Sequence, residues 1–459
     1  MMIKKVLIAN RGEIAVRIIQ ACQELHIQTV AVFSEPDRES LHVKLADEAY
    51  CIGPATASES YLNIENLIKV AVLTNVDAIH PGYGFLAENA EFVSMCEAFN
   101  ITFIGPTVEA IKLMGIKDIA RQTMAKADIP ITPGSNGLVT SDEEAIEIAE
   151  TIGYPIIIKA TAGGGGKGIR MANDRDSLLR EMKVTRQEAL TSFGNPGIYL
   201  EKYIENFRHI EVQIIADAFG NIVHLGERDC TVQRRMQKLV EETPSPVISD
   251  ETREKMGQTA VRAANAVNYV GAGTVEFIYD LNSDNFYFME MNTRIQVEHP
   301  ITEMVTGIDL VKEQIRIASG KQLQVAQKDI VLSGCSIECR INAEDPDNHF
   351  LPSPGVVTNY IVPGGYGVRV DSAVYPGYNI QPFYDSLIAK LIVHGDNRND
   401  AIQKMKRALN HFNIEGIHTT IPFFLNLFSH EIFINGEYNT KFLENHDVRN
   451  QKTPRVGQK

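Results

Sequence analysis

Charged and amide residues alternate with apolar residues along one segment of this chain, Met289–His299. In an extended segment, side chains two positions apart share a face. One face would then carry Glu290, Asn292, Arg294, Gln296 and Glu298. The ordinary interpretation of such alternation is the solvated outer face of a strand. The other is a reactive surface that combines two carboxylates, two amides and a guanidinium, and the neighbouring strand favours it.

That neighbouring strand is predicted over Gly273–Tyr279. Asn, Ser and Asp residues form a turn between it and Phe286–Phe288. If the turn is centred in this cluster, Glu276 faces Glu290 at a Cβ separation of about 5 Å, where like charges destabilise a hairpin. The pair therefore needs a shared proton or a cation. We favour the cation, because oxygen ligands that include Asn292 suit Mg²⁺ or Mn²⁺ better than zinc.

A glycine-rich loop lies between two apolar runs earlier in the chain. Tyr154–Ala160 is rich in β-branched residues, Thr161–Gly168 contains four consecutive glycines, and Ile169–Ala172 follows. A Rossmann fingerprint needs a helix directly after the loop, and a Walker loop needs Ser or Thr after its lysine; neither condition is met. The pattern predicts a strand–loop–strand hairpin whose N–H groups fold over an anion, with Lys159 and Lys167 adding charge. A merely flexible hairpin tip is the alternative.

The first third of the chain alternates strand-like and helix-like segments. A helix is expected over Glu13–Leu25, among strands at Lys5–Ala9, Thr29–Phe33, Ala78–His80 and Thr102–Gly105. This alternation predicts a doubly wound parallel sheet. Further along, Ile129–Gly137 has the composition of a linker. A capping box at Ser141–Glu144 opens a helix that ends at Gly153. The segment after Val331 is predicted to form a further α+β unit.

A glycine-rich hairpin followed by a hairpin with two metal carboxylates resembles the ATP-grasp superfamily. Longer motifs narrow the resemblance to biotin carboxylases: His80–Asn89, Glu201–Ile204, Gln233–Lys238, Glu290–Pro300 and Glu338–Glu344. The resemblance implies an α/β and α+β multidomain protein. It comprises an N-terminal doubly wound parallel-sheet (pre-ATP-grasp) domain, an ATP-grasp lid and core, and a C-terminal α+β domain. The expected ranges are 1–115, 116–330 with a mobile lid at about 133–203, 331–445, and a polar tail at 446–459.

The resemblance also implies a reaction in which ATP, bicarbonate and a carrier-bound biotin give ADP, phosphate and carboxybiotin through carboxyphosphate. Glu276, Glu290 and Asn292 would hold two Mg²⁺ or Mn²⁺ ions. Glu276 and Glu290 would also belong to the nucleotide-binding site. The phosphates would meet Lys117, Lys159, Gly165 and Gly166, and the adenine would meet Glu201, Lys202, Tyr203 and Ile204. The ribose side would meet His209 and Gln233, and Met236 would also lie at the nucleotide. Relatives commonly carry histidine at position 236, so this nucleotide contact is in question.

The same resemblance assigns the second half of the reaction. Lys238, Arg294, Gln296 and Val297 match the bicarbonate site, where a guanidinium can pair bidentately with carbonate. Glu298 matches the base that deprotonates bicarbonate, and Arg340 the residue that stabilises the biotin enolate. Tyr83 and Gly84 match a loop that faces biotin. The catalytic residues would then be Lys238, Arg294, Glu298 and Arg340.

Composition bounds the partners. At 459 residues with a net charge of −14, the chain is expected to form several domains and not to bind nucleic acid. It has neither a secretory signal nor an apolar run of 18 residues, which predicts a cytoplasmic protein without a membrane contact. Cys335 and Cys339 are interpreted as reduced cysteines on one strand face, not zinc ligands.

The expected partners follow from the family and from a missing motif. The sequence has no Met-Lys-Met biotin-attachment motif and no segment of carboxyltransferase length. We therefore expect the carboxylase subunit of an acetyl-CoA carboxylase, a homodimer that works with a biotin carboxyl carrier protein and carboxyltransferase subunits. Another ATP-grasp carboxylate–amine ligase would lack the run from Arg294 to His299. An ATP-sensing scaffold without chemistry would have lost Arg294 or Glu298.

Overall fold

The structure is a computed structural model, and it describes residues 2–135, 137–161 and 168–448. The chain forms two compact units, each assembled from separate stretches of sequence. Unit 1 comprises Met1–Lys112, Ile210–Val275 and Met291–Lys459, and unit 2 comprises Leu113–His209 and Glu276–Glu290. The two units are described in turn. The domain ranges expected from the sequence stay a prediction.

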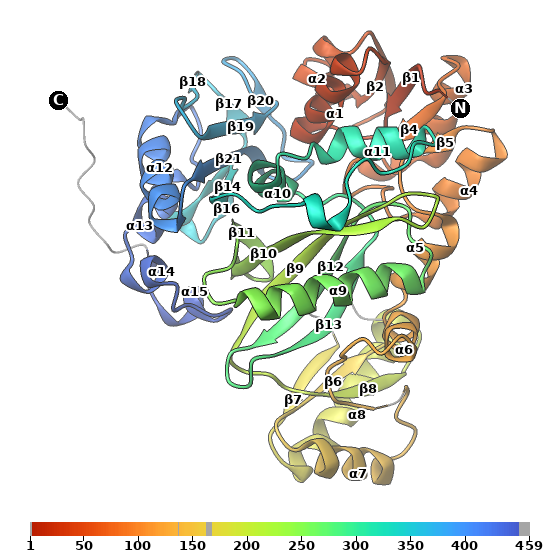
Figure 1. The fold of residues 1–459 in the computed structure, drawn as a ribbon, viewed down its shortest axis with the longest axis vertical. Coiled ribbons are helices and arrows are strands. Elements are labelled where there is room, and N and C mark those ends of the chain that lie inside the picture. The colour runs from red at the N-terminus through yellow and green to blue at the C-terminus, as the bar shows by residue number, and fades with distance from the viewer. Residues whose placement is uncertain (1, 136, 162–167, 449–459) are drawn as a thin grey trace. The chain divides into compact units, whose positions relative to one another are not determined.

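Unit 1 begins with the expected parallel sheet, in the order β3-β2-β1-β4-β5 (Figure 1). Its strands are β1 (Lys5–Ile8), β2 (Gln28–Ser34), β3 (Glu48–Gly53), β4 (Ala78–His80) and β5 (Thr102–Phe103). The accompanying helices are α1 (Gly12–Glu24), α2 (Leu41–Leu45), α3 (Ile64–Leu73), α4 (Ala90–Ala98) and α5 (Val108–Gly115). Sequence analysis predicted four of the five strands and missed β3.

Period-two alternation in β1 distributes the helices over the two faces of this sheet. Val6 and Ile8 pack with Ile18 of α1 in one apolar cluster. Leu7 packs with Leu67 of α3 in a second cluster on the other side. Successive strand residues point to opposite faces, so a fully apolar strand requires helices on both sides.

The larger sheet has eight strands in the order β13-β12-β9-β10-β11-β14-β21-β19 (Figure 1). These are β9 (Phe207–Ala216), β10 (Ile222–Arg234), β11 (Gln237–Thr243), β12 (Gly271–Asp280), β13 (Asn285–Asn292), β14 (Cys335–Asn342), β19 (Val368–Ser372) and β21 (Leu387–Gly395). The segment after Val331 adds β14, β21 and β19 to this sheet, and its other strands form three two-stranded sheets. Its strand β14 pairs antiparallel with β11, in the register Val240↔Cys339 and Glu241↔Glu338.

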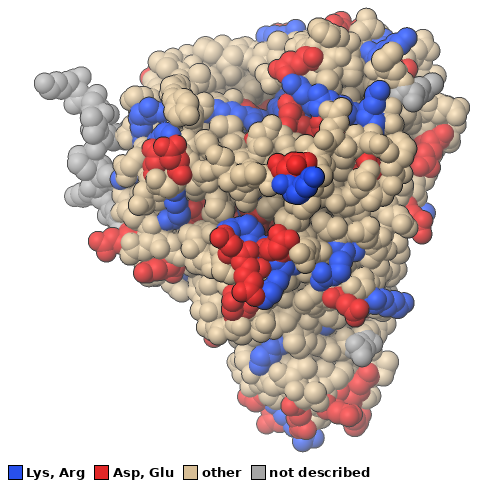
Figure 2. All heavy atoms as spheres, in the orientation of Figure 1, with Lys and Arg blue, Asp and Glu red and all other residues tan. Residues whose placement is uncertain are grey.

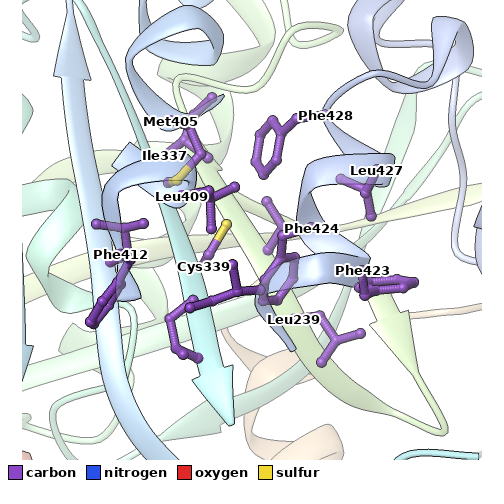
Figure 3. Close-up of a cluster of buried hydrophobic side chains, with 14 of the residues drawn as sticks. Leu239, Ile337, Cys339, Met405, Leu409, Phe412, Phe423, Phe424, Leu427 and Phe428 are labelled. Atoms are coloured by element: carbon purple, nitrogen blue, oxygen red, sulfur yellow. The ribbon is translucent and has the colours of Figure 1, made fainter. Parts of the chain in front are cut away.

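The two faces of β14 have different neighbours. Cys335, Ile337, Cys339 and Ile341 belong to a large buried apolar cluster. Figure 3 shows Ile337 and Cys339 among side chains of α12 (Arg398–His411) and α13 (Ile421–Leu427). Both cysteines are buried and free, as predicted. The alternate residues Glu338 and Arg340 therefore point to the opposite face, and a carboxylate and a guanidinium on this face are anchored by the apolar packing behind them.

The extended conformation predicted for Met289–His299 is wrong beyond Asn292. Strand β13 ends at Asn292, and α10 (His299–Thr306) begins with Glu298 as its N-cap. Pro300 occupies the first turn of α10, a position that favours helix initiation. Ile295, Gln296 and Glu298 are all buried. The polar residues of this segment therefore do not share one strand face, and Glu298 points inward.

Unit 2 contains a three-stranded sheet in the order β7-β6-β8. Its elements are β6 (Ile156–Ala160), β7 (Ile169–Ala172), β8 (Ile198–Lys202), α6 (Lys117–Lys126), α7 (Asp142–Ile152) and α8 (Arg175–Phe193). The predicted strand–loop–strand hairpin is confirmed, because β6 and β7 pair antiparallel with Lys159 opposite Ile169. The loop itself, with Gly165, Gly166 and Lys167, lies outside the described residues. Helix α7 begins as predicted, with the Ser141 side chain accepting from the Glu144 N–H.

The supposed linker Ile129–Gly137 is part of the fold of unit 2. Ile131 forms a β-bridge to Phe288, and Gly134 forms one to Glu201. These bridges satisfy backbone groups that a solvated linker would leave to water, and a composition rich in Pro and Gly does not reveal them.

The remaining elements of unit 1 are short strands and helices. They are α9 (Asp250–Ala266), α11 (Leu310–Ala318), α14 (Glu431–Asn435), α15 (Phe442–Asn445), β15 (Glu344–Asp345), β16 (Leu351–Pro352), β17 (Gly355–Val356), β18 (Asn359–Ile361), β20 (Asn379–Ile380) and β22 (Asn413–Glu415). The short strands pair as β15-β16, β17-β20 and β18-β22. Within the part of the chain that the structure describes, no helix combines the length and apolarity needed to cross a membrane. On the face drawn in Figure 2, the described Lys and Arg side chains are interspersed with Asp and Glu and form no continuous basic band.

Candidate active site

Glu298 is the centre of a buried ionic cluster in unit 1. Its carboxylate is fully buried and lies 2.8 Å from Lys238 Nζ and 2.9 Å from Arg340 Nη2. Burial alone would raise the pKa of this carboxyl, but the charges of Lys238, Arg340 and Arg228 outweigh burial and hold the pKa well below its ordinary value. Glu298 is therefore an anion at neutral pH, with both oxygens engaged by cations.

The cluster continues beyond Glu298 in both directions. Lys238 Nζ also lies 2.5 Å from Glu211, which in turn pairs with Arg228 Nε at 2.6 Å. Arg340 Nε donates to Glu241 at 2.7 Å. Positive and negative groups thus alternate in a row that we call the charge chain: Arg228, Glu211, Lys238, Glu298, Arg340 and Glu241.

Adjacent strands of the large sheet position the charge chain. Lys238 and Glu241 lie on β11, Arg340 on β14, and the remaining members on β9, β10 and the N-terminus of α10. Arg228 is fully buried, and it also donates to Gln213, Thr302 and Thr274. Since a buried charge is costly unless it is paired, these contacts hold every member in one geometry.

Arg294 is held in a second arrangement in unit 1. Its Nε lies 2.9 Å from Glu88, and its two terminal nitrogens donate to Gln296 at 2.9 Å and to Asn292 at 3.1 Å. The other Glu88 oxygen accepts from the backbone and hydroxyl of Thr293. The motif around His80–Asn89 and the motif around Arg294 are therefore joined through Glu88.

Tyr83 and Val297 are connected through two buried residues that sequence analysis did not name. The Tyr83 hydroxyl donates to Glu13. Lys390, fully buried, lies 3.1 Å from the second Glu13 oxygen and donates to the Val297 carbonyl at 3.0 Å. Gly84 follows at φ +69°, where a side chain would be strained. The loop predicted to face biotin and the Val297 residue assigned to bicarbonate are thus connected by one Glu–Lys pair.

In unit 2, Glu201 lies between two cations. Its side chain pairs with Arg121 at 2.7 Å and with Lys159. Lys202 donates through Nζ to the carbonyls of Gly153 and Tyr154, at 3.0 and 2.8 Å. The sheet thus brings three residues assigned to the nucleotide, Lys159, Glu201 and Lys202, to neighbouring positions on β6 and β8.

Three other residues of unit 2 that are assigned to the nucleotide are exposed or half-buried. Lys117 is exposed as the first residue of α6. Tyr203 and Ile204 follow the end of β8 and are half-buried. The Tyr203 N–H donates to the Pro155 carbonyl at 3.0 Å. A lysine at a helix N-terminus meets the positive end of the helix dipole, which disfavours its charge unless an anion binds there.

The predicted metal carboxylates lie on paired strands. Glu276 belongs to β12 and Glu290 to β13, neighbours in the large sheet, and the turn between the strands falls where it was predicted. Glu276 is buried and lies 2.9 Å from His209 Nε2. Two carboxylates on neighbouring strands of unit 2 are oxygen donors of the kind that Mg²⁺ or Mn²⁺ prefers. Asn292, the third predicted ligand, is the last residue of β13 and belongs to unit 1. The direct facing of Glu276 and Glu290 stays a prediction.

Gln233 and Met236 belong to a tight hairpin in unit 1. Arg234 pairs with Gln237, so that Arg235 and Met236 form a two-residue turn between β10 and β11, both with positive φ. Such turns favour Asn, Asp and Gly, and a long side chain is uncommon there. Met236 is 73% exposed. The Gln233 amide donates to the Cys230 carbonyl at 2.8 Å.

Sequence reasoning missed the residues that hold the predicted ones in place. Glu13, Glu88, Glu211, Glu241 and Lys390 are each bound to a residue with an assigned role, and Arg228 pairs with Glu211. For Glu211, Arg228, Glu241 and Lys390, only a charge within a strand-like apolar run could have revealed them. Glu241 and Glu242 within the strand-like run around Leu239–Thr243 are such a signal.

Comparison with known proteins shows which protein family shares this sequence and fold. Three family models match the chain: Biotin carboxylase, N-terminal domain, over residues 2–111; Carbamoyl-phosphate synthase L chain, ATP binding domain, over 117–326; and Biotin carboxylase C-terminal domain, over 338–445. Biotin carboxylase 1 of Bacillus subtilis is 64% identical over 447 residues, 97% of this chain and 99% of the relative. Biotin carboxylase of Nostoc sp. is 57% identical, over 96% of this chain and 98% of the relative.

Solved structures of biotin carboxylases have the same fold as this chain. The biotin carboxylase domain dimer of Hydrogenobacter thermophilus 2-oxoglutarate carboxylase, in complex with MgADP, ADP and bicarbonate, has a TM-score of 0.91 at 51% identity. The comparison covers 99% of this chain and 100% of that one. Biotin carboxylase from Campylobacter jejuni, in a β,γ-ATP complex, has a TM-score of 0.92 at 50% identity, covering 97% and 99%.

The hairpin of unit 2, the paired carboxylate strands and the matched ATP-binding model together define an ATP-grasp ligase. Within that class, the chain belongs to the biotin carboxylase family. Members of this family use ATP, Mg²⁺ and bicarbonate to carboxylate biotin.

Proposed function

We propose that the charge chain performs the proton and anion chemistry of biotin carboxylation, with Glu298 as the base that deprotonates bicarbonate. One observation carries this proposal: the buried Glu298 carboxylate contacts both Lys238 and Arg340. The bicarbonate oxygen would attack the γ-phosphorus of ATP, the bond to ADP would break, and the bicarbonate proton would pass to Glu298. Phosphoryl transfer requires mainly positioning and charge neutralisation.

Lys238 and Arg294 would bind bicarbonate together with Gln296 and Val297. The Arg294 guanidinium is oriented by Glu88, Gln296 and Asn292, so its plane is fixed before substrate arrives. Bidentate recognition by a planar guanidinium depends on such orientation.

Arg340 would stabilise the biotin enolate after N1 passes its proton to the phosphate released from carboxyphosphate. Its Nη2 contacts Glu298 and its Nε contacts Glu241. When Glu298 takes up a proton, the hold of Glu298 on Nη2 weakens, and that donor becomes free for the enolate oxygen. Glu241 keeps the guanidinium in place during this exchange.

The nucleotide would be bound by the residues that the family resemblance assigns to it. Lys117 and Lys159 would neutralise phosphate oxygens, and Glu201, Lys202, Tyr203 and Ile204 would border the adenine. Glu276, Glu290 and Asn292 would hold Mg²⁺ or Mn²⁺, which supplies charge neutralisation for the phosphates. Gly165 and Gly166 stay assigned from the sequence. His209 and Gln233 would border the ribose, and Met236 would lie at the nucleotide.

We further propose a role as the biotin carboxylase subunit of an acetyl-CoA carboxylase, as a homodimer served by a separate carrier protein and carboxyltransferase. Relatives include a subunit of pyruvate carboxylase from Methanothermobacter thermautotrophicus and the small subunit of 2-oxoglutarate carboxylase from Hydrogenobacter thermophilus. The molecule that finally accepts the carboxyl group therefore needs a test of its own. The dimer in the Hydrogenobacter structure supports the homodimer.

A single assay tests the reaction. Purified protein is supplied with MgATP, bicarbonate and free biotin, and ADP is measured with each component left out in turn. We expect ADP release that depends on both bicarbonate and biotin. ADP release unaffected by omission of biotin would contradict the proposed function. Adding acetyl-, propionyl- or pyruvate-specific carrier and transferase proteins then tests the acceptor.

A further inference from the structure

Glu338 is a buried carboxylate without an assigned role. It lies on β14, directly opposite Glu241 on β11. Neither Glu338 oxygen accepts a hydrogen bond from any residue that the structure describes, and the same holds for the Glu241 Oε2 atom. A buried polar atom without a partner costs about 1–3 kcal/mol. Three orphaned carboxylate oxygens on two facing residues therefore require an explanation.

The surrounding charges exclude two ionised carboxylates here. The charge chain contains three cations and three carboxylates, so an ionised Glu338 would add an unmatched negative charge. The groups that face Glu338 are Lys390 on β21, Glu241 on β11, Arg340 on β14 and Glu298 before α10. Tyr83 also faces it. Of the two cations, Lys390 is engaged by Glu13 and the Val297 carbonyl, and Arg340 by Glu241 and Glu298.

Protonation resolves the conflict. Two carboxylates that share a buried site cannot both ionise, and one proton held between them satisfies an orphaned oxygen on each residue. Burial raises the pKa of Glu338 well above its ordinary value, with Glu241 and Glu298 adding to the effect. Burial likewise raises the pKa of Glu241 to about 7, while Arg340 opposes the rise.

We propose that Glu338 is a positioning residue that works as a neutral carboxylic acid, sharing its proton with Glu241 Oε2 while Glu241 Oε1 stays on Arg340. The shared proton is independent of the reaction. Its catalytic consequence rests on the proposed function, in which Arg340 receives the enolate oxygen of biotin. An ionised Glu338 beside Arg340 would compete with that oxygen for the guanidinium. A neutral Glu338 leaves the enolate as the anion that Arg340 binds.

Infrared difference spectroscopy tests the shared proton. A protonated carboxylic acid has a carbonyl stretch that a carboxylate lacks. We expect the wild-type spectrum at pH 7.5 to contain such a band that Glu338→Gln removes. The exposed Glu254→Gln, on α9, is the matched control and should leave the band unchanged. Glu241→Gln should shift the band without abolishing it. Equal acid bands in wild type and Glu338→Gln would overturn the proposal.

The pH profile of turnover tests the positioning role. Rising pH removes the shared proton from wild type, whereas the amide introduced by Glu338→Gln stays neutral, so the ratio of kcat for this variant to wild type should rise between pH 7 and pH 9. At pH 7, Glu338→Gln should lower kcat by about threefold or less, and Glu241→Gln by about tenfold or more, because it removes the charge that holds Arg340. Parallel profiles with an equal loss in both variants would overturn the positioning role.

A second variant covers the case in which the amide fails to fold. Glu338→Leu is neutral and apolar, so it should also lack the acid band. The ratio of its kcat to that of wild type should likewise rise between pH 7 and pH 9. Failure of the proposed function can be distinguished from failure of this inference. If the proposed function is wrong, wild type shows no biotin-dependent ADP release, and the acid band can still be assigned to Glu338. An active wild type without the band contradicts only the inference about Glu338.

Discussion

The ionic residues of unit 1 and those of unit 2 are held in different ways. In unit 1, Glu298 has two cationic partners, and both of these partners contact a further carboxylate. In unit 2, Lys117 is an exposed helix residue, and Lys159 is a half-buried strand residue that pairs with Glu201. The charges of unit 1 are built into a sheet that is apolar on its other face, whereas those of unit 2 are closer to solvent.

This difference predicts where function and stability are coupled. A buried charge that loses its partner is strongly destabilising, whereas an exposed charge contributes little to folding. Substitutions in the charge chain should therefore affect both the fold and the reaction. Substitution of the exposed Lys117 in unit 2 should weaken nucleotide binding and leave the free energy of unfolding nearly unchanged.

The largest expected effect is on turnover in Glu298→Gln. The amide keeps the shape of the side chain but cannot accept the bicarbonate proton, so kcat should fall by about 10²- to 10⁴-fold. Because Glu298 is not among the nucleotide residues, the affinity for ATP should change little. Biotin- and bicarbonate-dependent ADP release gives kcat, and calorimetric titration gives the affinity.

Glu97→Gln, an exposed substitution on α4, is the control for Glu298→Gln. It should behave as wild type in both measurements. Turnover of Glu298→Gln within threefold of wild type would remove Glu298 from the role of base and would break the link between burial and chemistry in unit 1.

Arg228→Met should give the largest loss of stability. Arg228 is fully buried and donates to Glu211, Gln213, Thr274 and Thr302. Removing it leaves Glu211 with a single cation, and breaking a buried pair costs about 3–5 kcal/mol. Urea denaturation measures the change in the free energy of unfolding. The exposed Arg262→Met on α9 is the control, and an equally small change in both variants would contradict the coupling.

Glu276→Gln and Glu290→Gln test the ionic residues of unit 2. Each substitution removes one anionic oxygen ligand from the predicted metal site, so the Mg²⁺ concentration for half-maximal activity should rise by about 10- to 100-fold. Titration of activity with Mg²⁺ at fixed ATP measures it. If neither variant changes the Mg²⁺ dependence, the two carboxylates do not share a metal.

Strand patterns made much of this architecture predictable from the sequence. Apolar runs bounded by turn residues located β1, β2, β4, β12 and the hairpin β6–β7, because burial of a strand and the chemistry of a turn are both local. The break after Asn292 was not predicted, because the alternation of polar residues continues while tertiary packing buries Gln296 and Glu298. Alternation therefore identified the reactive residues correctly as a group but gave them the wrong conformation.

The partners of the reactive residues could not be predicted for a related reason. Glu241 faces Arg340 only because β11 and β14, about a hundred residues apart, are neighbours in the sheet. Lys390 reaches Glu13 from the other end of the chain. A single sequence contains the charges of these residues but not the strand order that pairs them, and family motifs pointed to the residues assigned to substrates, not to those that hold them.

Lys117→Met should weaken ATP binding without affecting the fold. Lys117 is exposed and begins α6, so its loss removes a charge directed at phosphate and no folded contact that the structure describes. A charge-assisted hydrogen bond of about 1.5 kcal/mol corresponds to roughly tenfold in affinity. Calorimetric titration of ATP measures the affinity, and urea denaturation should give an unchanged free energy of unfolding. Lys126→Met, at the other end of the same helix, is the control.

Met236→His is expected to have the smallest effect, and it concerns the position where the family resemblance leads us to expect histidine. Met236 is 73% exposed in a two-residue turn with positive φ, a backbone conformation in which histidine is more common than most side chains. A histidine here can donate a hydrogen bond to a nucleotide, whereas a thioether hardly can. One such bond is worth roughly 0.5–1.5 kcal/mol, so ATP should bind about twofold to twelvefold more tightly. Calorimetric titration of ATP against both proteins decides the matter, with Met236→Gln as the control for polarity. Unchanged or weaker binding in Met236→His would mean that the flexible methionine already packs against the nucleotide.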